Sequence, residues 1–195
     1  SEKVPLLDCF TAPCKGGCPI GQDIPEYIEL CRQGKYAQAL AVILEKNPLP
    51  FITGTICAHH CMDKCTRNFY ERSVQIRDTK LVAAERGYDQ VLPLLKPAAP
   101  VAGGRRVAVV GGGPTGMAAA YFCARAGVPV TIFEKEAALG GVVRHVIPAF
   151  RISDEAIEKD AALVRKMGVE VRLNTPAPSV EALKEQGYTH ILLAI

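Results

Sequence analysis

The feature that most constrains the fold is a glycine-rich turn placed between an apolar, β-branched segment and an alanine-rich one. The stretch Val107–Gly116 reads VAVVGGGPTG and contains the pattern G-x-G-x-x-G. Apolar patterning predicts a strand over residues 106–110, a helix over 115–126 and a second strand over 129–133. The acidic Glu134 follows the second strand. A strand, this turn, a helix and an acid at roughly 20 residues' distance together indicate a dinucleotide-binding unit.

The choice of glycine at each motif position of the turn has a chemical explanation. Gly111 allows the tight turn, Gly113 removes a side chain that would block a pyrophosphate, and Gly116 lets helix and strand pack closely. Unpaired amides at the helix start then face the phosphates. Glu134 would accept hydrogen bonds from a ribose hydroxyl, which disfavours a 2′-phosphate. The alternative is a turn of the same shape that binds nothing. The expected binding residues here are Gly111, Gly113, Pro114, Thr115, Gly116 and Glu134.

The rest of the second half continues the β-α alternation. We expect a helix over residues 154–167 capped by Ser153, a strand over 169–173, a short helix over 179–186 and a last strand from 189. This order implies a parallel sheet with right-handed crossovers. The sequence therefore predicts an α/β Rossmann-like domain over residues 105–195, truncated at its C-terminal end.

The first half has a different pattern. Residues 96–104 read KPAAPVAGG, which suits neither a helix nor a strand interior and indicates a linker. Before it, apolar residues recur at helical spacing after Pro25, again over 37–44, and over 75–86 with Gly87 at the helix end. Residues 1–95 are thus expected to form an α-helical domain. Because the chain begins without methionine and stops inside an apolar strand, we expect it to be part of a longer polypeptide.

Composition narrows the class of protein. No apolar run approaches the ~18 to 20 residues that cross a bilayer, and no secretory signal is present. The net charge of +3 is spread along the sequence, which predicts no nucleic-acid footprint. A cytoplasmic location follows, and there the eight cysteines would stay reduced. Metal binding or redox use is then the leading interpretation of these cysteines.

The cysteines fall into groups. If Cys57, Cys61 and Cys65 lie on one helix, the thiols of Cys57 and Cys65 are ~12 Å apart, which is too far for one small cluster. Cys57 and Cys61 can then share a cluster, and Cys65 should serve a different one. The first group ends in Cys18-Pro19, as in ferredoxins whose last cysteine serves another cluster. Zinc and free thiols remain alternatives, although C-x2-C pairs are missing. Cys31 and Cys123 are expected in the core. The candidate ligands are Cys9, Cys14 and Cys18, then Cys57, Cys61 and Cys65.

Two further segments carry a family resemblance. Residues 133–141, FEKEAALGG, and 147–151, IPAFR, resemble the FAD-binding half of the glutamate synthase small subunit and the flavin module of dihydropyrimidine dehydrogenase. The resemblance implies that the turn holds FAD rather than NAD. It also implies a backbone approach near Ala177, while an exposed arginine without a ligand is the alternative for Arg151. The further flavin contacts that it implies are Lys135, Gly140, Gly141, Val142 and Arg151.

The same resemblance implies two four-iron clusters in the helical domain, with ligands drawn crosswise from both cysteine groups. Two family ligand positions are occupied here by Leu6 and Lys80, so each cluster would have three cysteines. One iron of each cluster would then stay open, or a nearby residue (Asp8, His59, His60 or Asp63) would bind it in place of the missing ligand. The implied sets are Cys9, Cys14 and Cys65 for one [4Fe-4S] cluster and Cys18, Cys57 and Cys61 for the other. The stretches 8–14 and 54–61 further resemble an iron–sulfur flavoprotein subunit of selenate reductase.

The function implied is a segment of an NAD(P)H-dependent iron–sulfur flavoprotein oxidoreductase. NAD(P)H would bind downstream of this chain, and electrons would pass through FAD and the clusters to an electron-accepting subunit or domain. No side chain of the chain is expected to be catalytic, and the chain alone is expected to be inactive. The alternatives are a helical docking module without clusters and an NAD-dependent dehydrogenase with a zinc-bound appendix.

Overall fold

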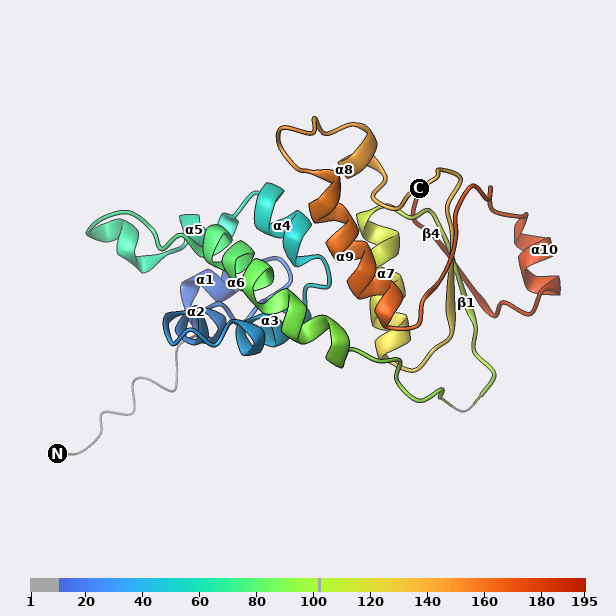
Figure 1. Ribbon diagram of the computed structural model, residues 1–195, viewed down its shortest axis with the longest axis horizontal. Helices are drawn as coiled ribbons and strands as arrows, with labels where there is room; N and C mark the ends of the chain where they lie inside the picture. The colour runs from blue at the N-terminus through green and yellow to red at the C-terminus, as the bar shows by residue number, and fades with distance from the viewer. Residues whose placement is uncertain (1–10, 102) are drawn as a thin grey trace.

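The computed structural model describes residues 11–101 and 103–195. The expected ligand Cys9 and the neighbouring Leu6 and Asp8 lie outside these residues. The molecule is elongated, with a helical part at one end and an α/β part at the other (Figure 1). The fold class expected from the sequence is confirmed.

The helical part is built from short helices, several of which carry proline in their first turn, where its missing N–H is no loss. The long helix α6 packs against α2, α3 and α4. Ile24, Tyr27, Ile43 and Ile76 form the buried centre of this packing. The elements are α1 Pro13–Gly16, α2 Ile24–Arg32, α3 Tyr36–Leu44, α4 Pro50–Ile56, α5 His60–Asp63, the 3-10 helix η2 Thr66–Phe69, α6 Ile76–Val91 and the 3-10 helix η3 Leu92–Leu94.

The expectation that a helix ends at Gly87 is wrong, because α6 continues to Val91. A Cβ added at Gly87 would lie 2.6 Å from the carbonyl oxygen of Tyr36. This glycine is therefore an internal contact point where α6 meets the start of α3. Its cost of about 1 kcal/mol within a helix is tolerated because the close packing needs it.

The α/β part contains a four-stranded parallel sheet in the order β3-β2-β1-β4. The cap predicted at Ser153 is confirmed, since its Oγ accepts the N–H of Ala156 at 3.2 Å. Strands on both sides of β1 place a topological switch point at its carboxyl end. The elements are β1 Val107–Val110, α7 Pro114–Arg125, β2 Val130–Phe133, α8 Val142–His145, α9 Asp154–Lys166, β3 Glu170–Arg172, α10 Val180–Glu185 and β4 His190–Leu193.

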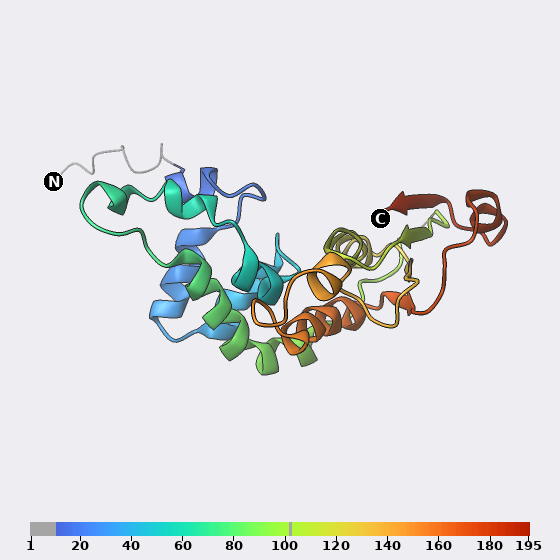
Figure 2. The same cartoon turned by 90° about the horizontal axis from the view of Figure 1, so that it is seen from above.

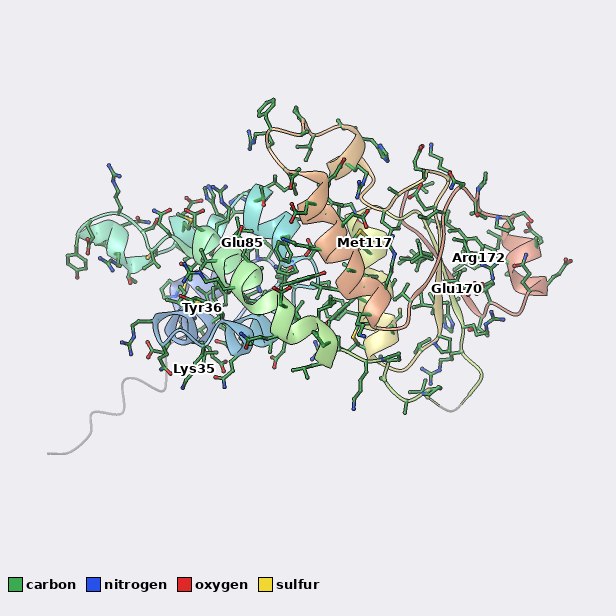
Figure 3. All side chains as sticks on the ribbon, viewed as in Figure 1. Lys35, Tyr36, Glu85, Met117, Glu170 and Arg172 are labelled. Atoms are coloured by element: carbon green, nitrogen blue, oxygen red, sulfur yellow. The ribbon has the colours of Figure 1, made fainter. Side chains whose placement is uncertain are left out.

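Helices cover both faces of the sheet. α7 and α9 lie between the sheet and the helical part, and α10 lies on the other side of the sheet (Figures 1 and 2). Leu183 of α10 packs with Ala108 and Phe133 on the outer face. On the inner face, Met117 is fully buried (Figure 3) in a cluster that also includes Ile52 of α4. The two parts therefore share a hydrophobic core.

The segment expected to be a linker packs on the α/β part. Residues 95–101 contain no helix or strand. The N–H of Val101 donates to the carbonyl of Gly127 at 2.9 Å, and a Cβ at Gly168 would lie 2.7 Å from Pro97. These contacts hold the connection against the ends of α7 and α9. Within the described residues, no helix combines the length and apolar character that crossing a membrane requires.

Candidate functional site

A cavity of about 990 Å³ lies at the carboxyl ends of β1, β2 and β4. Of the expected binding residues, it is lined by Gly111, Gly113, Pro114, Thr115, Glu134, Lys135, Gly141 and Val142, and also by Ala177. Gly116, Gly140 and Arg151 do not line it. Residues that motif reasoning missed are Val110, Phe133, Glu136, His145, Val146, Pro176, Ala194 and Ile195, which come mostly from strand ends. The position of a switch point could have indicated the strand-end residues.

The three motif glycines have different roles in the structure. Gly111 has a φ of +107°, and a Cβ there would lie 2.4 Å from the carbonyl oxygen of Ala194. At Gly116 a Cβ would lie 2.0 Å from the carbonyl oxygen of Gly111. A Cβ at Gly113 would meet only the Cα of Gly141, at 3.8 Å. Gly111 and Gly116 are thus required by the fold, whereas Gly113 keeps the cavity open.

Glu134 is fixed at the end of β2 by the backbone around it. Its Oε2 accepts the N–H of Gly112 at 2.6 Å, and its Oε1 accepts the N–H of Glu136 at 2.9 Å. Only 6% of the residue is exposed. Each carboxylate oxygen has more than one acceptor site, so the side chain can still receive a hydroxyl from a molecule in the cavity.

A second loop closes against the glycine-rich turn. The N–H of Gly140 donates to the carbonyl of Gly112 at 2.9 Å, and a Cβ at Gly141 would lie 2.8 Å from the Cα of Gly113. Val142 follows with 63% of its surface exposed at the cavity wall. Arg151 is exposed and lies outside the cavity lining. Gly140 therefore supports the site through its backbone.

The fold brings the two cysteine groups together. α1 packs against α5, and a Cβ at Gly17 would lie 3.2 Å from the Cα of Cys61. Cys14, Cys18 and Cys61 pack against the same hydrophobic cluster, around Tyr27. Burial raises the pKa of the Tyr27 hydroxyl, and the neighbouring cysteines raise it further. Segments more than forty residues apart in the sequence thus converge on one region.

The electrostatic coupling of the thiols shows which of them are neighbours. Burial raises the pKa of Cys14, and Cys65 and Cys18 raise it further. Burial also raises the pKa of Cys61, with Cys18 and Cys57 adding to the effect. Cys14 therefore lies near both Cys65 and Cys18, and Cys61 lies near both Cys18 and Cys57.

The condition that Cys57, Cys61 and Cys65 lie on one helix is wrong. α4 ends at Ile56, Cys57 is extended with a ψ of 139°, and His59 is left-handed with a φ of 49°. The break frees backbone amides from helical bonding, and the N–H of His59 donates to the Sγ of Cys57 at 3.4 Å. N–H groups directed at thiolate sulfur are among the features that tune iron–sulfur clusters.

The surroundings of the thiols fit a bound anionic centre. The Nδ1 of His59 is buried without a hydrogen-bond partner among the described side chains. Lys80 is 6% exposed; burial lowers its pKa, and Cys57, Cys18 and Cys61 counteract this. In residues 11–101 and 103–195, no three His, Cys, Asp or Glu side chains are grouped as ligands of a metal ion. In a four-iron cluster each thiolate binds its own iron, so its sulfurs stand farther apart than around one ion.

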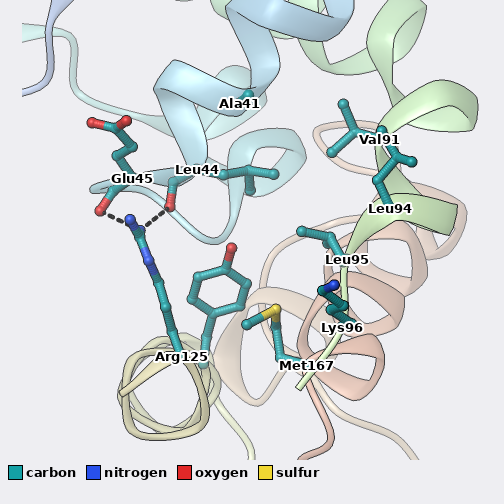
Figure 4. A pocket seen from close by; sticks show the side chains of 10 residues that line it. Ala41, Leu44, Glu45, Val91, Leu94, Leu95, Lys96, Arg125 and Met167 are labelled. Carbon is teal, nitrogen blue, oxygen red and sulfur yellow. Dashed lines mark hydrogen bonds between the residues drawn. The ribbon is translucent and has the colours of Figure 1, made fainter. Parts of the chain in front are cut away.

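Two side chains that the sequence reasoning missed join the helical part to the α/β part. Asp160 of α9 is fully buried, and its Oδ1 and Oδ2 accept the N–H groups of Phe51 (3.1 Å) and Ile52 (2.7 Å) at the start of α4. Arg125, at the end of α7, donates to the carbonyls of Leu44 (3.2 Å) and Glu45 (2.9 Å) at the end of α3. Figure 4 shows the two hydrogen bonds of Arg125 beside a cavity of about 330 Å³ between the two parts.

Comparisons with known proteins agree with this geometry. Residues 5–90 match the family described as dihydropyrimidine dehydrogenase domain II, 4Fe-4S cluster. Residues 109–158 match the NAD(P)-binding Rossmann-like domain. The two matched segments are thus similar to a 4Fe-4S cluster domain of the dihydropyrimidine dehydrogenase type and to an NAD(P)-binding Rossmann-like domain, and the resemblance expected from the sequence is confirmed.

Relatives that match 85% or more of the chain are named as oxidoreductases, or as subunits of an oxidoreductase or of glutamate synthase. The chain is 47% identical over all 195 residues to YgfK of Escherichia coli K12, provisionally named an oxidoreductase, and covers 19% of it. It is 34% identical over 187 residues to the NADPH-Fe(3+) oxidoreductase subunit beta of Geobacter sulfurreducens, covering 93% of this chain and 28% of the relative. It is also 34% identical over 166 residues to the glutamate synthase [NADPH] small chain of Mycobacterium tuberculosis, covering 85% and 34%. The chain thus spans less than two fifths of these relatives' lengths.

Proposed function

We propose that this chain is the electron-transferring segment of an NAD(P)H-dependent iron–sulfur flavoprotein oxidoreductase. The proposal rests on one observation. Two cysteine groups converge in the helical part, and this part shares a hydrophobic core with the α/β part, which contains the cavity. Such an arrangement keeps the two kinds of redox centre at a fixed separation. The protein's contribution is then to hold the centres and set their potentials.

The cavity supports a bound dinucleotide, and the resemblance of residues 133–141 and 147–151 to flavin-binding modules makes FAD the dinucleotide that we propose. The backbone N–H groups of Gly113 and Thr115 would face the pyrophosphate at the start of α7, and Glu134 would accept hydrogen bonds from the ribose hydroxyls. Lys135, Gly141 and Val142 would line the flavin side, with Gly140 supporting them through its backbone, and Arg151 would reach the flavin by a movement of its loop. Bound FAD would take up an electron pair and release the electrons one at a time.

The cysteines support one or two [4Fe-4S] clusters. Cys14 and Cys65, with Cys9, would hold one cluster, and Cys18, Cys57 and Cys61 the other. The N–H of His59 at Cys57 would stabilise the second by donating to a ligand sulfur. Three cysteines per cluster leave one iron each to another donor, and the buried Nδ1 of His59 is a candidate for the second cluster.

The proposal extends to the activity of the whole protein. Relatives named for NADPH support a nicotinamide site in a further part of the polypeptide, and an electron-accepting domain or subunit as partner. Selenate is a candidate acceptor only through the resemblance of stretches 8–14 and 54–61 to a subunit of selenate reductase. The cytoplasm, with its reduced thiols, is the compartment that suits such clusters.

One observation favours a second function. Lys80 stands where a cluster ligand is expected, and lysine as an ammonium ion has no lone pair to donate. A docking module without clusters would tolerate that residue.

Purification of the chain without oxygen, followed by iron, acid-labile sulfide, zinc and flavin determination, separates these functions. We expect iron and sulfide in equal amounts and about one flavin per chain after reconstitution with FAD. The Cys18→Ala, Cys57→Ala double variant should lose iron, and the Cys31→Ala, Cys123→Ala variant should keep it. Zinc in place of iron, or neither metal in the wild-type chain, would refute the proposal. NADPH-driven dye reduction by the isolated chain would contradict a nicotinamide site located elsewhere.

A further inference from the structure

Lys80 is a buried cation whose place in the fold needs an explanation. It lies on α6 with 6% of its surface exposed. Among the ion pairs of residues 11–101 and 103–195, none involves this side chain. A buried charge without a partner is strongly destabilising, because it loses its hydration and gains nothing in return.

The packing of α4 against α6 brings the part of α6 that carries Lys80 close to one of the cysteines. A Cβ at Gly54 would lie 3.1 Å from the Cα of Leu81, so α4 approaches α6 closely beside Lys80. One turn earlier on α6, Arg77 donates to the carbonyl of Cys57 at 3.5 Å. The end of α4, which carries Cys57, is thus attached to the same stretch of α6 that carries Lys80.

The ionisable groups near Lys80 include three thiols, one cation and the buried carboxyl of Asp160. Cys57, Cys18 and Cys61 are the neighbours that favour its charged form, and Arg77 is the neighbour that opposes it. Arg77 is itself near the carboxylate of Asp78, at 3.7 Å. Burial raises the pKa of the Asp160 carboxyl to about 8, so this group stays largely protonated at neutral pH. The negative charge near Lys80 then comes from the cysteines when they bind iron as thiolates.

Resting on the proposed function, we propose that the ammonium group of Lys80 is the counter-cation of the cluster held by Cys18, Cys57 and Cys61. A four-iron core bound by thiolates is anionic and becomes more so on reduction. A fixed positive charge beside it favours the reduced form and raises the reduction potential. In this role Lys80 is a positioning residue that sets the reduction potential of the cluster. In the metal-free chain its buried charge lowers the stability of the fold.

The test compares Lys80→Met, which keeps the length of the side chain, with Lys80→Arg, which keeps the charge. Lys46→Met is the matched control, since Lys46 is an exposed lysine of the same part that contacts the carbonyl of Gly21. Each chain is purified without oxygen. The thermal midpoint of the metal-free form is measured first, and the midpoint potential of the reconstituted clusters is then measured by titration monitored with electron paramagnetic resonance.

We expect Lys80→Met to raise the thermal midpoint of the metal-free chain and to lower the potential of one cluster. Lys80→Arg and Lys46→Met should leave that potential near the wild-type value. Equal potentials in the wild type and Lys80→Met would overturn the proposal, as would a metal-free Lys80→Met that is less stable than the wild type. Failure of the wild type to bind iron would instead refute the proposed function on which the inference rests.

Discussion

At the scale of single residues, two glycines of one motif can be separated by what a methyl group would meet. Beside Gly113 there is open space toward the cavity, whereas at Gly116 the carbonyl oxygen of Gly111 occupies the position. The motif itself is local, so its presence and its strand-turn-helix setting were predictable from sequence. Which glycine serves the fold and which serves a ligand depends on contacts that only the folded chain defines.

Gly113→Ala is expected to leave the free energy of unfolding within about 0.5 kcal/mol of the wild-type value. It should weaken flavin nucleotide binding by about tenfold or more, because the added methyl group enters the phosphate region. Gly116→Ala should lower the free energy of unfolding by about 2 kcal/mol or more, since α7 must move away from β1. Denaturant unfolding and fluorescence titration with FAD measure both effects. Equal losses of stability in the two variants would be evidence against this division of roles.

At the scale of elements, the helix ends explain how the two parts are joined. α4 has no side-chain cap of its own at Leu49, and Asp160, 108 positions away from Ile52, takes that role. Sequence reasoning predicted the cap at Ser153 because that contact spans three residues. It missed Asp160, and it ended a helix at Gly87, because both depend on contacts between distant segments.

Replacing Asp160 should test this cross-domain cap. Asp160→Ala leaves two buried N–H groups of α4 without acceptors, so we expect a loss of about 2 to 4 kcal/mol in the free energy of unfolding. Asp154→Ala, an exposed acid on the same helix, is the control and should cost much less. Chemical denaturation of the metal-free chains gives both numbers. A loss at Asp160 no larger than at Asp154 would show that the cap is not needed.

The same carboxyl group gives the chain a pH-dependent stability. Burial raises the pKa of Asp160 from 3.8 to about 8, despite the two N–H donors, which lower it. A group that holds its proton more tightly when folded stabilises fully below its unfolded pKa and loses that contribution as pH rises through its folded pKa. The stability of the wild type relative to Asp160→Asn should therefore fall between about pH 4 and pH 8. A difference that grows over this range would show that Asp160 is ionised in the folded chain.

At the scale of the whole molecule, α7 and α9 connect the redox sites. α7 begins at the glycine-rich turn and ends at Arg125, which holds the end of α3. α9 fixes α4, and α4 leads directly to Cys57. The grouping of cysteines was predictable from their spacing. Their supporting geometry was not, because the helix is broken between Cys57 and Cys65 and the packing of α1, α2, α5 and α6 sets where the thiols meet.

Electron paramagnetic resonance of the chain, purified without oxygen and reduced with dithionite, tests the central claim most directly. We predict the signal of a reduced [4Fe-4S] cluster in the wild type and in the Cys31→Ala, Cys123→Ala control. The signal should change or disappear when Cys18, Cys57 or Cys61 is replaced by alanine. A wild-type chain without such a signal, or a signal unaffected by these three replacements, would contradict the account.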